Sequence, residues 1–197
     1  LDLEPGGVEA VRRRVLIDDQ GTDEETPHPI RSTTLAQPAL FLIEYALAQR
    51  LMRFGVEPVA LIGHSLGELV AAALAKVMSY EDALRLVVHR GRIMNAQPAG
   101  AMLSVRMPAA ELRKLLPAGA EIASENAPLL SVASGPFDAL SALEAGLAAA
   151  GIGHRRLHTS HAFHSAMMEP VVEELEHVAA SIRLSPPQCR LISTVTG

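Results

Sequence analysis

Hydrophobic and polar positions along the first part of the chain predict an alternation of helices and strands. Residues 38–54 are almost entirely apolar, which predicts a mostly buried helix, and Gly55 suits its C-terminal cap. Residues 59–62 read Val-Ala-Leu-Ile and predict a short strand buried on both faces, as in a parallel sheet. Before them, a short helix is expected around residues 8–17, followed by an exposed acidic loop over residues 18–29.

Two further helices are predicted after this strand. Apolar residues recur at spacings of three and four between Leu66 and Val77, which indicates a helix with one apolar face. The next helix is expected to begin at Ser79, whose hydroxyl can cap it together with Asp82, and to run to about Asn95. A strand, a tight turn and a helix therefore follow one another directly around residue 65.

The pattern changes at residue 101. From there to residue 158, short apolar segments and helical segments follow in the order β-α-β-β-α-β, which is the ferredoxin-like motif. The predicted fold is thus α/β, with a small ferredoxin-like subdomain at residues 100–158 inserted into a larger body with a parallel sheet. Residues 1–99 and 159–197 would form that body, the second part adding a helix near residues 171–182 and a last strand.

Composition restricts the classes of protein to consider. The chain has 197 residues, of which 49% are hydrophobic and 3% aromatic, with a net charge of -5 and one cysteine, Cys189. Mild acidity without a basic cluster argues against nucleic acid as a partner, and no apolar stretch reaches the roughly 18–20 residues that cross a membrane. A single cysteine excludes an internal disulfide, and no set of metal ligands is predicted. Without a secretory signal, a cytoplasmic location is expected.

Ser65 is a candidate nucleophile. It is the central residue of Gly63-His64-Ser65-Leu66-Gly67, a G-x-S-x-G motif between the predicted strand and helix. A strained serine backbone would leave room only for small residues on both sides, and the backbone N–H of Leu66 could stabilise an oxyanion at the start of the helix. The alternative is that Ser65 merely caps the helix after a buried strand.

A nucleophilic serine requires a base, normally a histidine. Of the eight histidines, His161 and His164 lie in the segment that leaves the small subdomain, between the two lobes, where clefts usually form. A histidine there could instead hydrogen-bond to loop backbone. No Asp or Glu between Ser65 and His164 sits at a recognisable strand end of the main sheet, which argues against the triad of an ordinary esterase.

Arg90 is predicted to lie on the apolar face of its helix. Its neighbours three and four positions away are Leu86, Val87, Ile93 and Met94, all apolar. A guanidinium in such a place is costly unless it is paired. Its partner could be the carboxylate of a ligand, held by the two-pronged guanidinium, or an internal carboxylate; the side chain could also reach solvent.

Three segments together resemble one known family. Gly63–Glu68 reads GHSLGE, His89–Met94 reads HRGRIM and His161–Pro170 reads HAFHSAMMEP. These resemble the malonyl-CoA:acyl carrier protein acyltransferase family, and within it the acyltransferase domains of modular type I polyketide synthases. The resemblance extends from about Arg31 to Gly197 and implies a hydrolase-like α/β body with an inserted ferredoxin-like lobe.

The resemblance also implies roles for individual residues. Ser65 would be acylated by malonyl-CoA and would deliver the malonyl group to the phosphopantetheine thiol of an acyl carrier protein, with no bound cofactor. His164 would take and return the proton, and Arg90 would bind the malonyl carboxylate. The substrate pocket would further include His64, Met94, Asn126, Phe163 and Gln37. A neighbouring ketosynthase domain and its linker are implied as additional partners.

Selection of the acyl group is expected from three features that resemble malonyl-selective domains. They are the His-Ala-Phe-His segment with Phe163, Leu66 after the serine, and Thr-Thr-Leu-Ala-Gln at residues 33–37. A bulky Phe163 would occupy the space that a 2-methyl branch needs, and one methyl group contributes only about 1–3 kcal/mol of discrimination.

The chain also departs from the family pattern. The N-terminal Gly-Gln-Gly motif, whose glutamine supplies an oxyanion contact, has no match, and no segment follows Ser-Thr-Val-Thr-Gly at the end. We therefore expect a piece of a longer polypeptide, impaired in rate, since an oxyanion donor contributes about 100- to 1000-fold. Two alternatives stay open at this stage, a serine esterase or thioesterase and a non-catalytic docking or scaffold part of a synthase.

Overall fold

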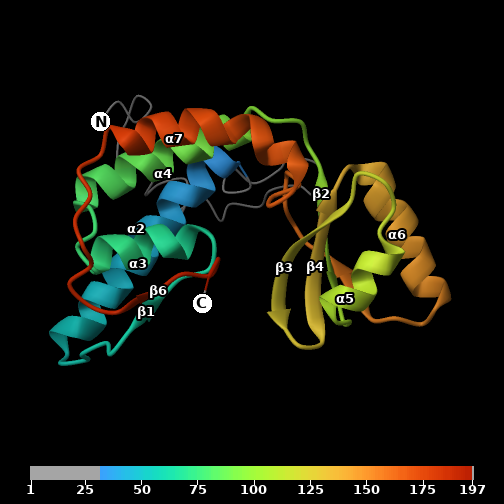
Figure 1. Cartoon of the computed structure of the whole chain (residues 1–197), viewed down its shortest axis with the longest axis horizontal. Coiled ribbons are helices and arrows are strands. Elements are labelled where there is room, and N and C mark those ends of the chain that lie inside the picture. Colours follow the sequence, from blue (N-terminus) through green and yellow to red (C-terminus); the bar gives the residue numbers. More distant parts are fainter. Residues whose placement is uncertain (1–31, 197) are drawn as a thin grey trace, which may run out of the picture. The chain divides into compact units, whose positions relative to one another are not determined.

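The computed structural model describes residues 32–196, which form two compact units (Figure 1). The first unit comprises the described residues up to Ile93 and those from Glu173 onward, and the second is Met94–Val172. Together they contain helices, a two-stranded parallel sheet and a four-stranded antiparallel sheet, an α/β architecture. The helix and loop expected before residue 30 lie outside the described residues, and the domain limits at residues 100 and 158 stay a prediction.

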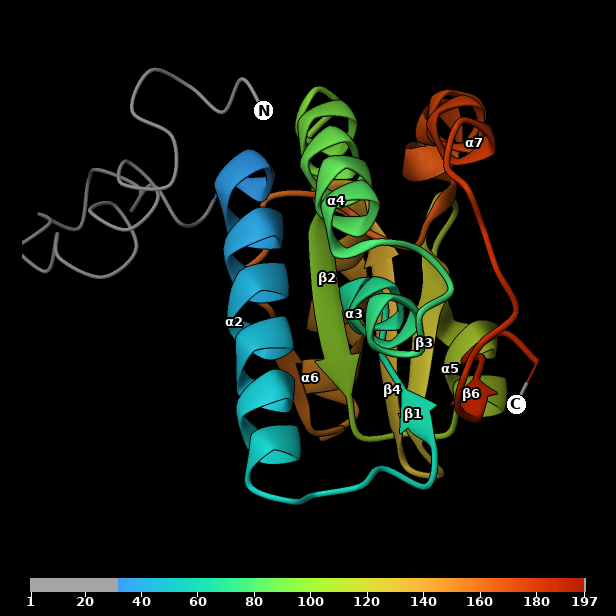
Figure 2. The same ribbon diagram turned by 90° about the vertical axis from the view of Figure 1, so that its left-hand side faces the viewer.

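The first unit is organised around three helices that share one apolar core. They are α2 (Thr33–Arg53), α3 (Leu66–Leu74) and α4 (Tyr80–Asn95), which lie beside one another in Figure 2. Phe41 is fully buried among them, and its ring contacts those of Tyr45 and Tyr80 at centroid distances of 6.0 and 5.9 Å. Strands β1 (Leu61–Ile62) and β6 (Leu191–Ile192) pair in parallel, which confirms the predicted last strand, and α7 (Val172–Ala180) precedes β6.

The predicted helix at residues 38–54 exists but is not mostly buried. It begins earlier, at Thr33, with Pro38 inside it, and ends before Gly55, whose φ of +88° suits a C-terminal cap. Four large apolar side chains on it are exposed by 46–58%, namely Leu40, Ile43, Leu47 and Leu51. The prediction of burial was wrong because α3 and α4 of the described chain cover only one side of a helix that is apolar almost all round.

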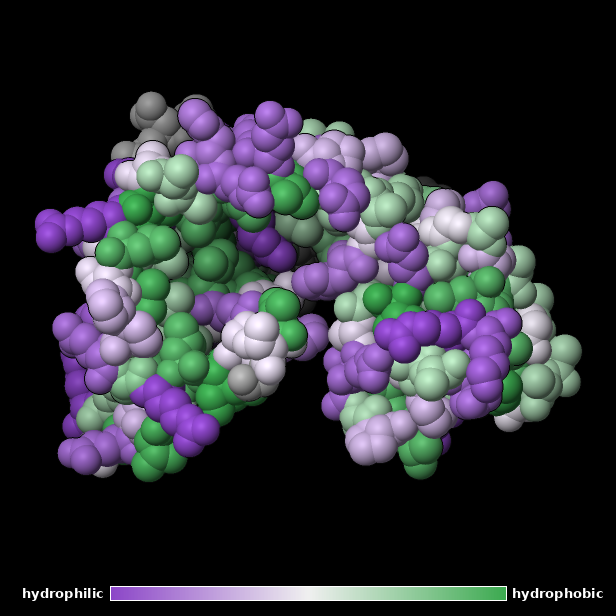
Figure 3. Space-filling model, viewed as in Figure 1, coloured by the Kyte–Doolittle hydropathy of each residue, from purple (hydrophilic) through white to green (hydrophobic). Residues whose placement is uncertain are grey.

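The strand before Ser65 is likewise shorter and more exposed than predicted. It has two residues instead of four, and the exposed fractions are 93% for Val59 and 66% for Ile62. The parallel pairing was predicted correctly, but β6 is the single strand that pairs with β1 among residues 32–196. A strand is buried on both faces only where other elements pack on each face of its sheet, and residues 32–196 do not supply such elements for β1. Hydrophobic surface is therefore visible on this unit in Figure 3.

The second unit has the predicted β-α-β-β-α-β order. Its strands are β2 (Ala101–Val105), β3 (Glu121–Ala127), β4 (Leu130–Gly135) and β5 (His154–Arg156), and its helices are α5 (Ala109–Leu112), continued by the 3-10 turn η2 (Arg113–Leu115), and α6 (Phe137–Ala149). The spatial order is β3-β4-β2-β5, with neighbouring strands antiparallel.

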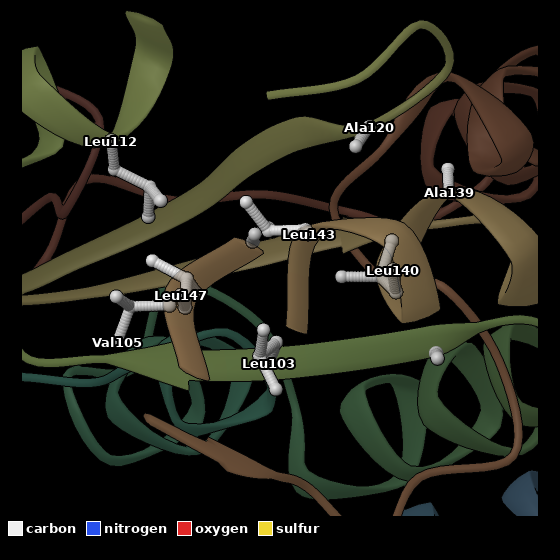
Figure 4. Packing of buried hydrophobic residues seen from close by; sticks show 10 residues of the cluster. Leu103, Val105, Leu112, Ala120, Ala139, Leu140, Leu143 and Leu147 are labelled. Carbon is white, nitrogen blue, oxygen red and sulfur yellow. The ribbon is translucent and has the colours of Figure 1, made fainter. Parts of the chain in front are cut away.

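An aliphatic core holds this second unit together (Figure 4). Leu103 and Val105 of β2 are fully buried against Leu112 of α5 and against Leu140 and Leu147 of α6. Alternate residues of a strand point to the same face of a sheet, so β2 presents both of its side chains to these helices. A 3-10 segment, η3 (Ala166–Val171), then leads into α7.

None of the helices within residues 32–196 has both the length and the apolar character that a crossing of the bilayer requires.

The predicted cap of α4 is present. Asp82 N–H donates to Ser79 Oγ at 3.0 Å, and the Ser79 hydroxyl donates to Asp82 Oδ2 at 2.8 Å. We predict that Ser79→Ala lowers the free energy of unfolding by about 1 kcal/mol, because it leaves a helix N–H without its acceptor. Urea denaturation measures this loss. Ser79→Thr retains the hydroxyl and should remain close to wild type; equal losses in both variants would contradict the cap.

Candidate functional site

Ser65 lies on a sharp turn between β1 and α3. Its backbone angles are φ 52° and ψ −110°, which side-chain-bearing residues rarely adopt and which typically cost about 1–3 kcal/mol. Ser65 stands at the N-cap position of α3, but its side chain makes no capping bond to the helix, so the structure does not support a capping role for its hydroxyl. The turn is closed by backbone bonds instead, from Gly67 N–H to the His64 carbonyl and from Glu68 N–H to the Ser65 carbonyl.

The two glycines of the motif are not equivalent. A Cβ atom on Gly63 would lie 2.0 Å from the carbonyl carbon of Gly67, so the first turn of α3 packs directly on Gly63. A Cβ atom on Gly67 would approach the Glu44 carboxylate no closer than 3.7 Å, an ordinary contact. The expectation that the turn needs a small residue on both sides is therefore corrected: only Gly63 is required by packing within the described part of the chain.

The start of α3 provides a backbone donor beside the serine. Leu66 is the first residue of the helix, and its side chain is buried in the three-helix core. The N–H groups of Gly67 and Glu68 bind carbonyls of the turn, whereas the structure shows no acceptor within residues 32–196 for the Leu66 N–H. A donor at the positive end of a helix dipole can stabilise negative charge on an oxygen bound next to Ser65.

Arg90 extends from α4 to this turn. Its Nη1 donates to Oε1 of Gln37 at 2.5 Å, and its Nη2 donates to the Ser65 hydroxyl oxygen at 3.3 Å. The helices α4 and α2 meet closely at Gly91, where a Cβ atom would lie 2.8 Å from the Thr33 carbonyl oxygen. This close approach brings Gln37, one turn further along α2, to the guanidinium.

The charge of Arg90 has no carboxylate partner among residues 32–196. Both side chains that it contacts, Gln37 and Ser65, are neutral, and burial lowers the pKa of the guanidinium from its ordinary value. The described structure thus does not support an internal ion pair, one of the alternatives that the sequence left open. A partly desolvated cation next to a serine hydroxyl has the chemistry to bind an anionic group close to that hydroxyl.

Glu68 has a structural role that was not predicted from the sequence. Its Oε1 accepts the backbone N–H of Thr194, two residues after β6, at 2.7 Å. This bond holds the chain that follows β6 against the first turn of α3, beside the end of β1. Ligands of parallel α/β sheets bind at this carboxyl edge, so Glu68 fixes the edge on which Ser65 lies. An acid at the N-terminus of a helix was the only signal available in the sequence.

The remaining predicted residues are distributed over the two units. In the first, His64 is exposed beside Ser65. The second begins at Met94, which is buried one turn after Arg90 on α4, and it includes Asn126, which is exposed near the end of β3. The structure thus brings Ser65, Arg90 and Gln37 together, while the roles of the other residues stay predictions.

The two candidate histidines differ in their surroundings. His161 is buried, and its ring nitrogens contact Ser160 Oγ at 2.7 Å and the Gln97 carbonyl at 3.1 Å. It therefore has a local structural role, as one interpretation of these histidines proposed. His164 is exposed, and Phe163 packs its ring near that of His161, with 5.9 Å between centroids. The pairing of His164 with Ser65 stays a prediction.

Within residues 32–196, no three His, Cys, Asp or Glu side chains cluster in a way that could hold a metal ion.

Comparison with known proteins identifies relatives of this chain. Residues 15–197 match the family model described as acyl transferase domain. A type I polyketide synthase for phenolphthiocerol synthesis from Mycobacterium marinum is 47% identical over 167 residues, which are 84% of this chain and 8% of that protein. The chain thus spans a small part of this relative.

Solved structures show the same relationship. The acyltransferase domain from the second module of the salinomycin polyketide synthase is 39% identical, with a TM-score of 0.85; the match covers 96% of this chain and 44% of that one. The malonyl CoA-acyl carrier protein transacylase from Burkholderia pseudomallei is 29% identical, with a TM-score of 0.84, over 95% of this chain and 64% of that one.

The unequal packing of the two glycines gives a direct test of the turn. Gly63→Ala should lower the free energy of unfolding by about 1–3 kcal/mol or more, because its methyl group would overlap the backbone of α3. Gly67→Ala is the matched control and should be neutral or stabilising by up to about 1 kcal/mol, since alanine favours a helix over glycine. Equal destabilisation in urea denaturation would refute the described packing.

Proposed function

The chain belongs to the acyl transferase domain family, among the acyltransferase domains of modular type I polyketide synthases, and on this premise we propose that it transfers malonyl groups. The donor would be malonyl-CoA, the intermediate an ester of Ser65, and the acceptor the phosphopantetheine thiol of an acyl carrier protein. The observation that carries the proposal is the hydrogen bond between Arg90 and Ser65 Oγ, with no carboxylate on Arg90 among the described residues.

The chemistry of a malonyl ester fits this arrangement. One methylene group separates its free carboxylate from the ester carbonyl, so a cation that binds the carboxylate must lie within a few ångströms of the serine oxygen. Arg90 Nη2 lies 3.3 Å from Ser65 Oγ, and the planar guanidinium can bind both carboxylate oxygens. Gln37 Oε1 accepts a hydrogen bond from Nη1 of Arg90 and so holds the guanidinium in place. An acetyl group has no carboxylate to offer, so it cannot use this contact.

The proposed reaction has two halves. Ser65 Oγ attacks the thioester carbonyl of malonyl-CoA and passes its proton to His164, which gives it to the departing coenzyme A thiolate. In the second half, His164 takes the proton of the carrier-protein thiol as the sulfur attacks the seryl ester, and it gives that proton to Ser65 Oγ as the malonyl thioester leaves. The Leu66 N–H stabilises the oxyanion in both halves. His64, Met94 and Asn126 would line the acyl pocket.

The finer assignments of fold and partners belong to the same proposal. We infer a hydrolase-like parallel-sheet body with an inserted ferredoxin-like subdomain, acting in the cytoplasm beside a ketosynthase domain and its linker. The parallel pair β1–β6 and the strand order β3-β4-β2-β5 support the fold assignment. The small share of the polyketide synthase relative that the chain matches supports a place within a larger assembly.

Arg90→Ala tests the carboxylate site. It should reduce malonyl loading by at least about 10-fold while leaving acetyl loading nearly unchanged, because hydrogen bonds to charged groups contribute about 1.5–3 kcal/mol. Loading is followed by intact-protein mass spectrometry with each acyl-CoA. Arg92→Ala, an exposed arginine on the same helix, is the control and should load both donors normally. Equal losses for malonyl and acetyl would refute the role of Arg90.

Phe163→Ala tests selection against a branched acyl group. Removing the ring should raise loading of methylmalonyl relative to malonyl by about 10-fold, since one methyl group in a pocket is worth about 1–3 kcal/mol. Competition between the two acyl-CoA donors measures the ratio. Phe137→Ala, a half-exposed ring at the start of α6, is the control. An unchanged ratio would show that Phe163 does not limit the space beside the acyl group.

A further inference from the structure

The segment that carries His164 has a constrained backbone. His164 has a φ of +59°, in the left-handed region that residues with side chains seldom occupy. Such a conformation persists only where the surrounding structure determines it. The contacts on either side of His164 therefore decide where its side chain points.

The chain before His164 is fixed by His161. The buried imidazole contacts Ser160 and the Gln97 carbonyl, and His161 pairs with Ala99 in an isolated antiparallel bridge. The Gly100 N–H adds a backbone bond to the Ser160 carbonyl. His161 thus anchors one end of the segment to the chain that enters β2.

The chain after His164 is fixed by a carboxylate from a different element. Ser165, which is buried, donates its hydroxyl to the Ala162 carbonyl at 2.7 Å and so closes the turn across His164. The next residue, Ala166, donates its backbone N–H to Glu121 Oε2 at 2.8 Å. Glu121 is the first residue of β3, the edge strand of the antiparallel sheet, so this bond fastens the start of η3 to the sheet.

We propose that Glu121 is a positioning residue for His164. Its carboxylate holds the backbone two residues after the histidine, and the bond is charge-assisted because an ionised carboxylate accepts an N–H. With His161 holding the other end, Glu121 fixes the left-handed turn from which the His164 imidazole projects. The inference rests on the proposed function only in that His164 is the base; the anchoring itself is a property of the second unit.

This assignment gives a function to an acid that the triad pattern does not use. Glu121 lies between Ser65 and His164 in the sequence but at the start of a strand of the small sheet, and it binds backbone at Ala166. A general base has to meet its proton donor within hydrogen-bond reach, and a shift of about 1 Å can cost about 100-fold in rate. A residue that fixes the backbone of the base therefore controls the rate without touching the substrate.

The test compares three variants in the full chain. Glu121→Ala removes the acceptor, Glu121→Gln retains a neutral carbonyl acceptor, and Glu125→Ala removes a carboxylate of the same strand that pairs with Arg113 at 3.1 Å. Amide hydrogen exchange by NMR reports the Ala166 N–H directly, and the imidazole signals of His164 report its surroundings. Malonyl transfer rates are measured for each variant alone and combined with His164→Ala.

Glu121→Ala should increase exchange at Ala166 at least about 10-fold, shift the His164 ring signals and slow transfer by about 10- to 100-fold. Glu121→Gln should restore most of each property, and Glu125→Ala should resemble the wild type. In the His164→Ala background, Glu121→Ala should have no further effect on the transfer rate. If Glu121 had a purely structural role, Glu121→Ala would reduce the transfer rate by the same factor in the wild-type and His164→Ala backgrounds.

Unchanged exchange and unchanged ring signals in Glu121→Ala would overturn the inference, as would equal rate losses with and without His164. A His164→Ala variant that transfers malonyl at the wild-type rate would instead refute the proposed base, while the exchange data would still decide whether Glu121 anchors the turn. Failure of His164 as the base and failure of Glu121 as its positioning residue therefore give different results.

Discussion

The site depends on one interaction, the contact of a partly desolvated guanidinium with a serine hydroxyl. Arg90 lies between Gln37 and Ser65, and neither neutralises its charge. Burying a cation without a carboxylate partner is unfavourable, so Arg90 lowers the free energy of unfolding of the unliganded protein. A substrate that brings a carboxylate to the serine would recover that free energy on binding, which is the physical basis for the proposed preference for a malonyl over an acetyl donor.

Close approaches of backbone make this contact possible. Gly63 lets the first turn of α3 pack directly on the residue that follows β1, and this packing shapes the turn that carries Ser65. Gly91 lets α4 approach α2 closely, and this approach brings Gln37 to Arg90. Carboxylates then fix the loops that follow. Glu68 binds the backbone after β6, and Glu121 binds the backbone after His164. In both places a side chain on a regular element holds irregular backbone next to a proposed catalytic residue.

Local patterns in the sequence predicted much of this. The cap at Ser79, the strand–turn–helix around Ser65 and the β-α-β-β-α-β order depend on neighbouring residues, and all are present. The burial of α2 and β1 was predicted wrongly. An apolar pattern shows that a segment can pack against other elements, but it does not show whether such elements are present in the same part of the chain. The anchoring by Glu68 and Glu121 joins residues 126 and 45 positions apart, and a single contact at such separation leaves no periodic signal.

Mapping of the acyl group after incubation with malonyl-CoA shows whether Ser65 carries the acyl ester. The chain is digested after brief exposure to the donor, and tandem mass spectrometry locates any added malonyl group. We expect a malonyl ester on the peptide that contains Ser65, with none in a Ser65→Ala variant. Steady hydrolysis of malonyl-CoA without a Ser65 adduct, or an adduct on another residue, would contradict it.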